Sequence, residues 1–204
     1  MLEKTFNDLI AAYAGDEALV KRLWLEIETE YSGEQRYYHT LKHLEHLLNQ
    51  LQEIKPFLKE WKTILFTLFY HDVIYDVLKP DNEEKSAGLA EKRMQELRVP
   101  DEMIRCCTKQ ILATKTHIRS EEVDTNYFTD ADLSVLGQDW ENYAAYSGNV
   151  RKEYAAYQDS FYNPGRKKVL EHFLAMDRIF KTAYFYDKYE KQARQNLKAE
   201  LELL

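Results

Sequence analysis

The apolar residues of this chain follow a helical pattern along almost its whole length. They recur at three- and four-residue steps, which places them on one face of an α-helix. No run alternates strictly between apolar and polar residues, the pattern of a half-buried strand. We therefore expect an all-α, multi-helix bundle. The expected helices cover residues 2–13, 16–32, 40–54, 61–75, 83–97, 100–112, 132–136, 139–162, 167–179 and 187–204.

The segments between these helices carry helix-breaking residues. Residues 76–82 and 114–125 are polar and are expected to be loops. Asn163-Pro164-Gly165 is typical of a turn, Asp16 is placed to cap the second helix, and Gly137 is expected to end a helix. No repeat, linker or low-complexity tract divides the chain, so we expect one domain over residues 1–204.

The segment 61–75 is apolar almost all round, which predicts a helix buried on most sides. His71 and Asp72 interrupt it. A buried, ionised carboxylate costs several kcal/mol unless it is paired or coordinated, so this position favours a bound cation. Imidazole and carboxylate ligands together suit Mn, Fe, Co, Ni or Zn, or Mg with retained water.

Two further polar groups lie in helical contexts. His39, His43 and His46 fall within about 60° of one another on a helical wheel, opposite a face of leucines. Asp130 and Asp132 precede a short apolar helix and would point about 160° apart if helical. One of these two carboxylates can therefore be a metal ligand while the other caps the helix.

The order of these residues resembles a known family. His43, His71-Asp72 and Asp132 resemble the H…HD…D signature of the HD-domain metal-dependent phosphohydrolases. YHTLKH and DADLS are similar to the YHxxxH and ADLS elements of cyclic-nucleotide phosphodiesterases, which favours His43 over His39, and Asp132 over Asp130, as ligands. The blocks RYYHTLKHLEHLL, FYHDVIYD, DNEEKSA, FTDADLSVLG and VRKEY resemble one bacterial branch of HD phosphohydrolases across most of residues 30–200.

The resemblance implies an HD-type helical domain that hydrolyses a phosphomonoester, phosphodiester or pyrophosphate bond, including that of a nucleotide. His43, His71, Asp72 and Asp132 would hold a divalent metal whose bound water attacks the phosphorus. His39 would protonate the leaving oxygen, so His39 and Asp72 are the expected catalytic residues. The chain is much shorter than the true cyclic-nucleotide phosphodiesterases and lacks their aromatic and glutamine clamp for a purine.

Five other side chains near the motif blocks are candidates for contact with a substrate phosphate or with the metal ligands. They are Arg36, Lys85, His117, Asp130 and Arg151. For each of them a solvated, ion-paired or purely structural role is the alternative. His46 is expected at the surface or behind a ligand.

Two other functional classes stay open at this stage. One is a non-catalytic HD module that uses its metal to bind a phosphorylated ligand. The other is an HD-type di-iron oxygenase, which needs more histidine ligands; only His46 and His117 remain to supply them.

Net charge and hydropathy exclude some classes of binding partner for this protein. The net charge of −7 argues against a nucleic-acid groove, which needs a basic surface. No apolar run reaches the roughly 18 residues of a membrane span, and the N-terminus lacks a signal-peptide pattern. We therefore expect a cytoplasmic protein. The resemblance implies that its substrate is a small phosphorylated compound. Adjacent Cys106 and Cys107 point in different directions on a helix, so we expect reduced thiols with at least one in the core.

Overall fold

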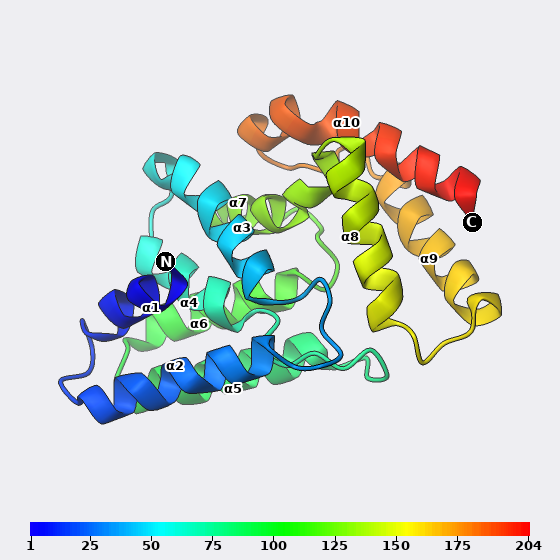
Figure 1. Cartoon of the computed structure of the whole chain (residues 1–204). Helices are drawn as coiled ribbons and strands as arrows, with labels where there is room; N and C mark the ends of the chain where they lie inside the picture. The colour runs from blue at the N-terminus through cyan, green and yellow to red at the C-terminus, as the bar shows by residue number, and fades with distance from the viewer. The chain divides into compact units, whose positions relative to one another are not determined.

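The computed structural model describes residues 1–204 and is built of helices without any β-strand (Figure 1). This confirms the all-α prediction. The chain divides into two compact units, Met1–Thr129 and Asp130–Leu204. The expectation of one domain stays a prediction. None of the helices combines the length and the apolar composition that crossing a membrane requires.

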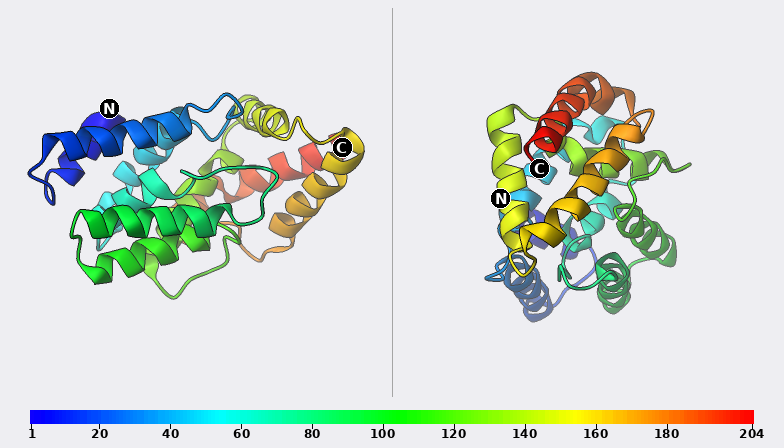
Figure 2. Two further views of the ribbon diagram at one scale, coloured as in Figure 1. Left: turned by 90° about the horizontal axis from the view of Figure 1, so that it is seen from below. Right: turned by 90° about the vertical axis from the view of Figure 1, so that its right-hand side faces the viewer.

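The first unit is organised around one buried helix. The α-helices of this unit are α1 (Leu2–Ile10), α2 (Glu17–Tyr31), α3 (Leu41–Glu53), α4 (Trp61–Tyr70), α5 (Asn82–Glu96), α6 (Asp101–Ala113) and all but the last turn of α7 (Val123–Asp132). A 3-10 turn, η1 (Lys55–Phe57), follows α3. Every residue of α4 from Thr63 to Tyr70 is buried, and α4 packs against α1, α3, α5 and α6. Helices α5 and α6 lie side by side (Figure 2).

Aromatic packing joins the first helices to α4. The ring of Phe6 meets the ring of Phe69 edge-on, with centroids 4.9 Å apart, and Trp24 contacts both. Phe6 and Phe69 are fully buried. Truncation of such a ring to alanine typically costs about 3–5 kcal/mol, so this cluster contributes strongly to the stability of the unit. The start of α2 is capped as the sequence suggests, with Asp16 accepting from the Ala18 amide. The start of α3 is capped by Thr40, which accepts from the Lys42 amide.

The second unit comprises η2 (Leu133–Gly137), α8 (Trp140–Glu153), α9 (Asp159–Ala175) and α10 (Ala183–Leu203). Its interior holds an ion pair in which Arg166 donates from Nε and Nη2 to the Glu200 carboxylate, at 2.7 and 2.9 Å. The Tyr143 hydroxyl donates to the same carboxylate. Because every oxygen of the buried acid has a donor, this pair links α8, α9 and α10 without leaving a charge unsatisfied.

Several element boundaries predicted from the sequence are wrong. Helix α4 ends at Tyr70 rather than at residue 75, and α7 begins at Val123 inside the expected loop. The helix expected over 139–162 stops at Glu153. Asn163-Pro164-Gly165 lies inside α9 instead of separating two helices.

The helix expected over 139–162 ends early because Arg151, in the last turn of α8, forms hydrogen bonds with the chain between α8 and α9. Arg151 donates to the carbonyls of Tyr154 and Tyr157 and to the Asp159 carboxylate. These contacts satisfy carbonyls that the end of α8 leaves without helical partners. Arg151, a candidate for substrate contact, therefore holds this turn together.

The cysteines behave as expected. Both are free thiols, and Cys107 is fully buried. Burial raises the pKa of the Cys107 thiol to about 12, which keeps it protonated and unreactive at neutral pH.

Gly137 ends η2, as its sequence position suggests, and it is also required for close packing against α10. A Cβ at this position would lie 2.4 Å from the Tyr189 Cβ and 2.9 Å from its Cα. We expect Gly137→Ala to lower the free energy of unfolding by about 1–3 kcal/mol or more, because the backbone of α10 would have to move. Urea unfolding followed by circular dichroism measures this change.

Gly148 is the matched control, since it lies inside α8 and a Cβ there meets no atom within 4 Å. Gly148→Ala should instead raise stability by about 0.5–1 kcal/mol, the usual gain in a helix interior. Equal effects of the two substitutions would show that η2 and α10 do not pack as closely as described.

Candidate metal centre

His39, His43, His71 and Asp72 form one cluster in the first unit, here called the histidine cluster. His43 lies in the first turn of α3, and His39 lies just before this helix, next to the capping residue Thr40. His71 and Asp72 follow the last residue of α4. His39 is thus outside α3, although its helical-wheel position groups it with His43.

The imidazoles of the histidine cluster gather around one carboxylate oxygen. Asp72 Oδ2 lies 3.1 Å from the Nε2 atom of His71, 3.8 Å from that of His43 and 3.9 Å from that of His39. The Nε2 atoms of His43 and His71 are 3.2 Å apart. Three ring nitrogens and one carboxylate oxygen therefore face a common point.

His71 and Asp72 form hydrogen bonds of different kinds where α4 ends. His71 Nδ1 lies 3.0 Å from the Leu68 carbonyl, which can only accept, so Nδ1 carries the proton. In a continued helix this carbonyl would accept from the Asp72 amide. The Asp72 amide instead donates to the Tyr31 hydroxyl at 3.2 Å. The ring of His71 is thereby fixed in the tautomer that presents an unprotonated Nε2 to the cluster.

Burial differs across the histidine cluster. The side chains of His71 and His43 are 0% and 2% exposed, whereas those of His39 and Asp72 are 19% and 21% exposed. The expectation of a fully buried Asp72 was therefore wrong; the buried partner is His71. The cluster has a dry side formed by two imidazoles and a side that solvent or a substrate can reach.

Aromatic rings hold the imidazoles in place. Tyr38 packs against the rings of His39 and His43, with centroids 4.9 and 5.0 Å away. Tyr75 lies 4.2 Å from the His39 ring, and Phe128 of α7 meets His71 edge-on at 5.5 Å. These contacts restrict ring rotation, so the Nε2 atoms are oriented in advance.

The two aspartates near the end of α7 have different environments. Asp130 is fully buried, and its carboxylate accepts from the amides of Lys181 and Thr182 and from the Thr182 hydroxyl. The Lys181 ammonium lies 3.3 Å away. Asp130 therefore sits inside α7 and binds the chain before α10, which corrects the idea that one of the pair caps the short helix. Asp132 is the last residue of α7 and is only partly buried.

The basic candidates have local partners. Arg36 donates to three main-chain carbonyls, those of His39, Asp72 and Val73. Lys85 pairs with Asp81 at 2.9 Å on the exposed face of α5. His117 follows α6 with a φ of 52°, a left-handed conformation that is uncommon for a residue other than glycine.

The geometry adds tyrosines that sequence reasoning missed. Tyr31 accepts from the Asp72 amide, Tyr75 packs on His39, and Tyr38 packs on two imidazoles. Tyr38 is the first residue of YHTLKH and Tyr75 lies in the block FYHDVIYD, which was the available signal. Tyr31, at the end of α2, lies outside both motifs and carried none.

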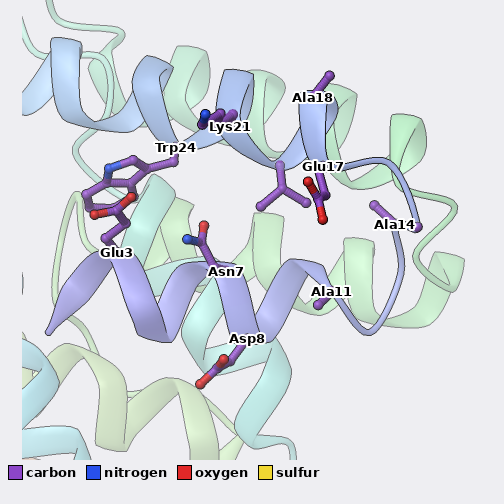
Figure 3. A pocket seen from close by; sticks show the side chains of 11 residues that line it. Glu3, Asn7, Asp8, Ala11, Ala14, Glu17, Ala18, Lys21 and Trp24 are labelled. Atoms are coloured by element: carbon purple, nitrogen blue, oxygen red, sulfur yellow. The ribbon is translucent and has the colours of Figure 1, made fainter.

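A hollow of about 610 Å³ lies elsewhere in the first unit, between α1 and α2 (Figure 3). The side chain of Asn7 points into it, and Trp24 closes one end. None of the predicted site residues lines this hollow. The candidate chemistry therefore depends on the histidine cluster and not on the size of a cavity.

Comparison of this chain with protein-family models, with curated proteins and with solved structures found no match.

Proposed function

We propose that this protein is a metal-dependent phosphohydrolase that cleaves a phosphomonoester, phosphodiester or pyrophosphate bond, including that of a nucleotide. Its metal ligands would be His43, His71, Asp72 and Asp132. The observation that carries the proposal is the convergence of three imidazole Nε2 atoms on one oxygen of Asp72. Imidazole nitrogens and a carboxylate oxygen are the donor types that a borderline divalent ion takes, and here the three nitrogens lie within 3.9 Å of the oxygen.

The donor atoms fit a divalent ion. Two nitrogens that each bind one ion at about 2.1 Å lie about 3 Å apart, which matches the 3.2 Å between His43 Nε2 and His71 Nε2. The proton of His71 is held on Nδ1 by the Leu68 carbonyl, the arrangement typical of a metal-binding histidine. The donor types of His43, His71 and Asp132, two imidazoles and a carboxylate, could hold a metal ion.

The register of α7 supports Asp132 as a further ligand. Phe128 contacts the His71 ring, and Asp132 follows Phe128 by four residues in the same helix. Residues four apart lie on the same face of an α-helix. The face of α7 that packs on His71 is therefore the face that carries Asp132, whereas Asp130 is committed to Lys181 and Thr182.

The residues of the cluster would divide the work between binding and proton transfer. When bound, the divalent ion supplies Lewis acidity toward the phosphate and lowers the pKa of water. His43 and His71 are buried and fixed in orientation, and they would bind the metal ion. His39 is the more exposed imidazole, with its Nε2 3.9 Å from Asp72 Oδ2, where it can donate a proton to the leaving oxygen. Tyr75 holds the His39 ring for this step.

Metal content gives the first test. The purified protein should contain a transition metal, and chelation should abolish hydrolysis of a panel of nucleotides and phosphoesters that Mn, Co, Ni or Mg then restores. His71→Ala should lose the metal, because it removes the nitrogen that the Leu68 carbonyl orients. Elemental analysis and turnover measure the two effects.

His172→Gln serves as the control for that experiment, since His172 is exposed on α9. Its metal content and turnover should equal those of the wild type. If none of the nucleotides and phosphoesters is cleaved with any of these metals, the proposal that the protein is a hydrolase is wrong. If a phosphorylated compound then binds without reaction, the protein is a ligand-binding module, and substrate-dependent oxygen uptake would identify an oxygenase.

The role of His39 gives a separate prediction. His39→Gln should retain the metal but lower kcat by about 100- to 10,000-fold, the usual contribution of a general acid. The loss should be smaller for a substrate with a good leaving group, such as a nitrophenyl ester, because such a group needs less protonation. An equal loss on both kinds of substrate would assign His39 to metal binding or to structure.

A further inference from the structure

Arg36 joins the two chain segments that carry the histidine cluster. Its Nη1 atom donates both to the His39 carbonyl, at 3.0 Å, and to the Asp72 carbonyl, at 2.8 Å. Its Nη2 atom donates to the Val73 carbonyl at 2.9 Å. A single nitrogen therefore bridges the main chains of the two residues whose side chains face each other across 3.9 Å.

Two tyrosines hold the guanidinium in this position. It lies over the ring of Tyr31, 4.8 Å from the centroid, and near the ring of Tyr75 at 5.5 Å. Such cation–π contacts are favourable at partly exposed sites. Both tyrosines also touch the cluster directly, since Tyr31 accepts from the Asp72 amide and Tyr75 packs on His39.

The hydrogen bonds of Arg36 satisfy main-chain carbonyls that the early end of α4 leaves without helical partners. Because the helix stops at Tyr70, the carbonyls of Asp72 and Val73 have no helical amide to accept from. A planar, charged guanidinium satisfies both of them, and its positive charge is favourable at the C-terminal end of a helix. The same donor then reaches the segment before α3, so that segment is tied to the end of α4.

We infer that Arg36 is a positioning residue that sets the separation of His39 and Asp72, and that it does not bind the substrate phosphate. This inference rests on the proposed function, since it deepens the account of the same site. It selects between the two roles that the sequence left open for Arg36. Three of the five N–H donors of the guanidinium are taken by main-chain carbonyls of the two segments that carry the cluster, which is what a positioning role requires.

The test compares Arg36→Lys with the wild type, because an ammonium keeps the charge but cannot reach three carbonyls in one plane. Titration calorimetry with Co²⁺ alone, and the visible spectrum of bound Co²⁺, report the ligand geometry without any substrate. We expect affinity for Co²⁺ to fall by about 10- to 100-fold with an altered spectrum, the usual effect of removing a group that orients metal ligands. In turnover, kcat should fall while KM stays near that of the wild type.

Arg194→Lys is the matched control. Arg194 also donates to three main-chain carbonyls, those of Leu174, Met176 and Asp177, and lies in the second unit. It should lose stability to a similar extent but keep the Co²⁺ affinity and spectrum of the wild type. Equal Co²⁺ binding by Arg36→Lys and wild type would overturn the inference, and a rise in KM with kcat unchanged would assign Arg36 to the substrate.

Two further measurements cover the remaining cases. If Arg36→Lys does not fold, Arg36→Ala with added ethylguanidinium should recover the wild-type Co²⁺ spectrum, whereas ethylammonium should not. Recovery by both ions, or by neither, contradicts the inference.

If the wild type binds no Co²⁺, the proposed function fails by itself. The inference is then judged by NMR: the ring-current shift of His39 protons by Tyr75 should disappear in Arg36→Lys, and its persistence would count against the positioning role.

Discussion

The hydrogen bond from His71 Nδ1 to the Leu68 carbonyl is the interaction on which the candidate site depends. It fixes the His71 tautomer and so sets the chemistry of the ring that faces His43 at 3.2 Å. Helix α4 ends at Tyr70, and the Asp72 amide donates to the Tyr31 hydroxyl instead of to the Leu68 carbonyl. The two contacts together place Asp72 beside the histidines.

A helix that ends inside a core leaves polar main-chain groups to be satisfied. Here the partners come from three places: the Tyr31 hydroxyl accepts from the Asp72 amide, Arg36 donates to the Asp72 and Val73 carbonyls, and Ser86 exchanges hydrogen bonds with the Ile74 main chain. The cost of breaking the helix is offset by side chains from α2, α5 and the segment before α3. The position of Asp72 is therefore determined by several elements, which suits a residue that must present one oxygen to three imidazoles.

Much of this architecture could be predicted from the sequence, because periodicity reports which residues face a core. The buried character of α4, the capping by Asp16 and the burial of Cys107 follow from local pattern. The end of α4 at Tyr70 does not, since the apolar run FYHDVIY continues the helical spacing, and the Tyr31 hydroxyl that accepts from the Asp72 amide is brought there only by the fold. Likewise, Asn163-Pro164-Gly165 indicates a turn by composition, but Arg151 stabilises the break several residues earlier.

The same limit applies to the site residues. Helical spacing and apolar context marked His39, His43, His71 and Asp72 separately, the resemblance grouped them, and the structure places all four in one cluster. Spacing treated Arg36 as a basic side chain near a motif, for which a phosphate is an obvious partner. Main-chain carbonyls released by a broken helix compete for the same guanidinium, and they are already in place before any ligand arrives. A cation beside a candidate active site is thus better judged by the acceptors that the backbone leaves unsatisfied around it than by the charge of the expected substrate.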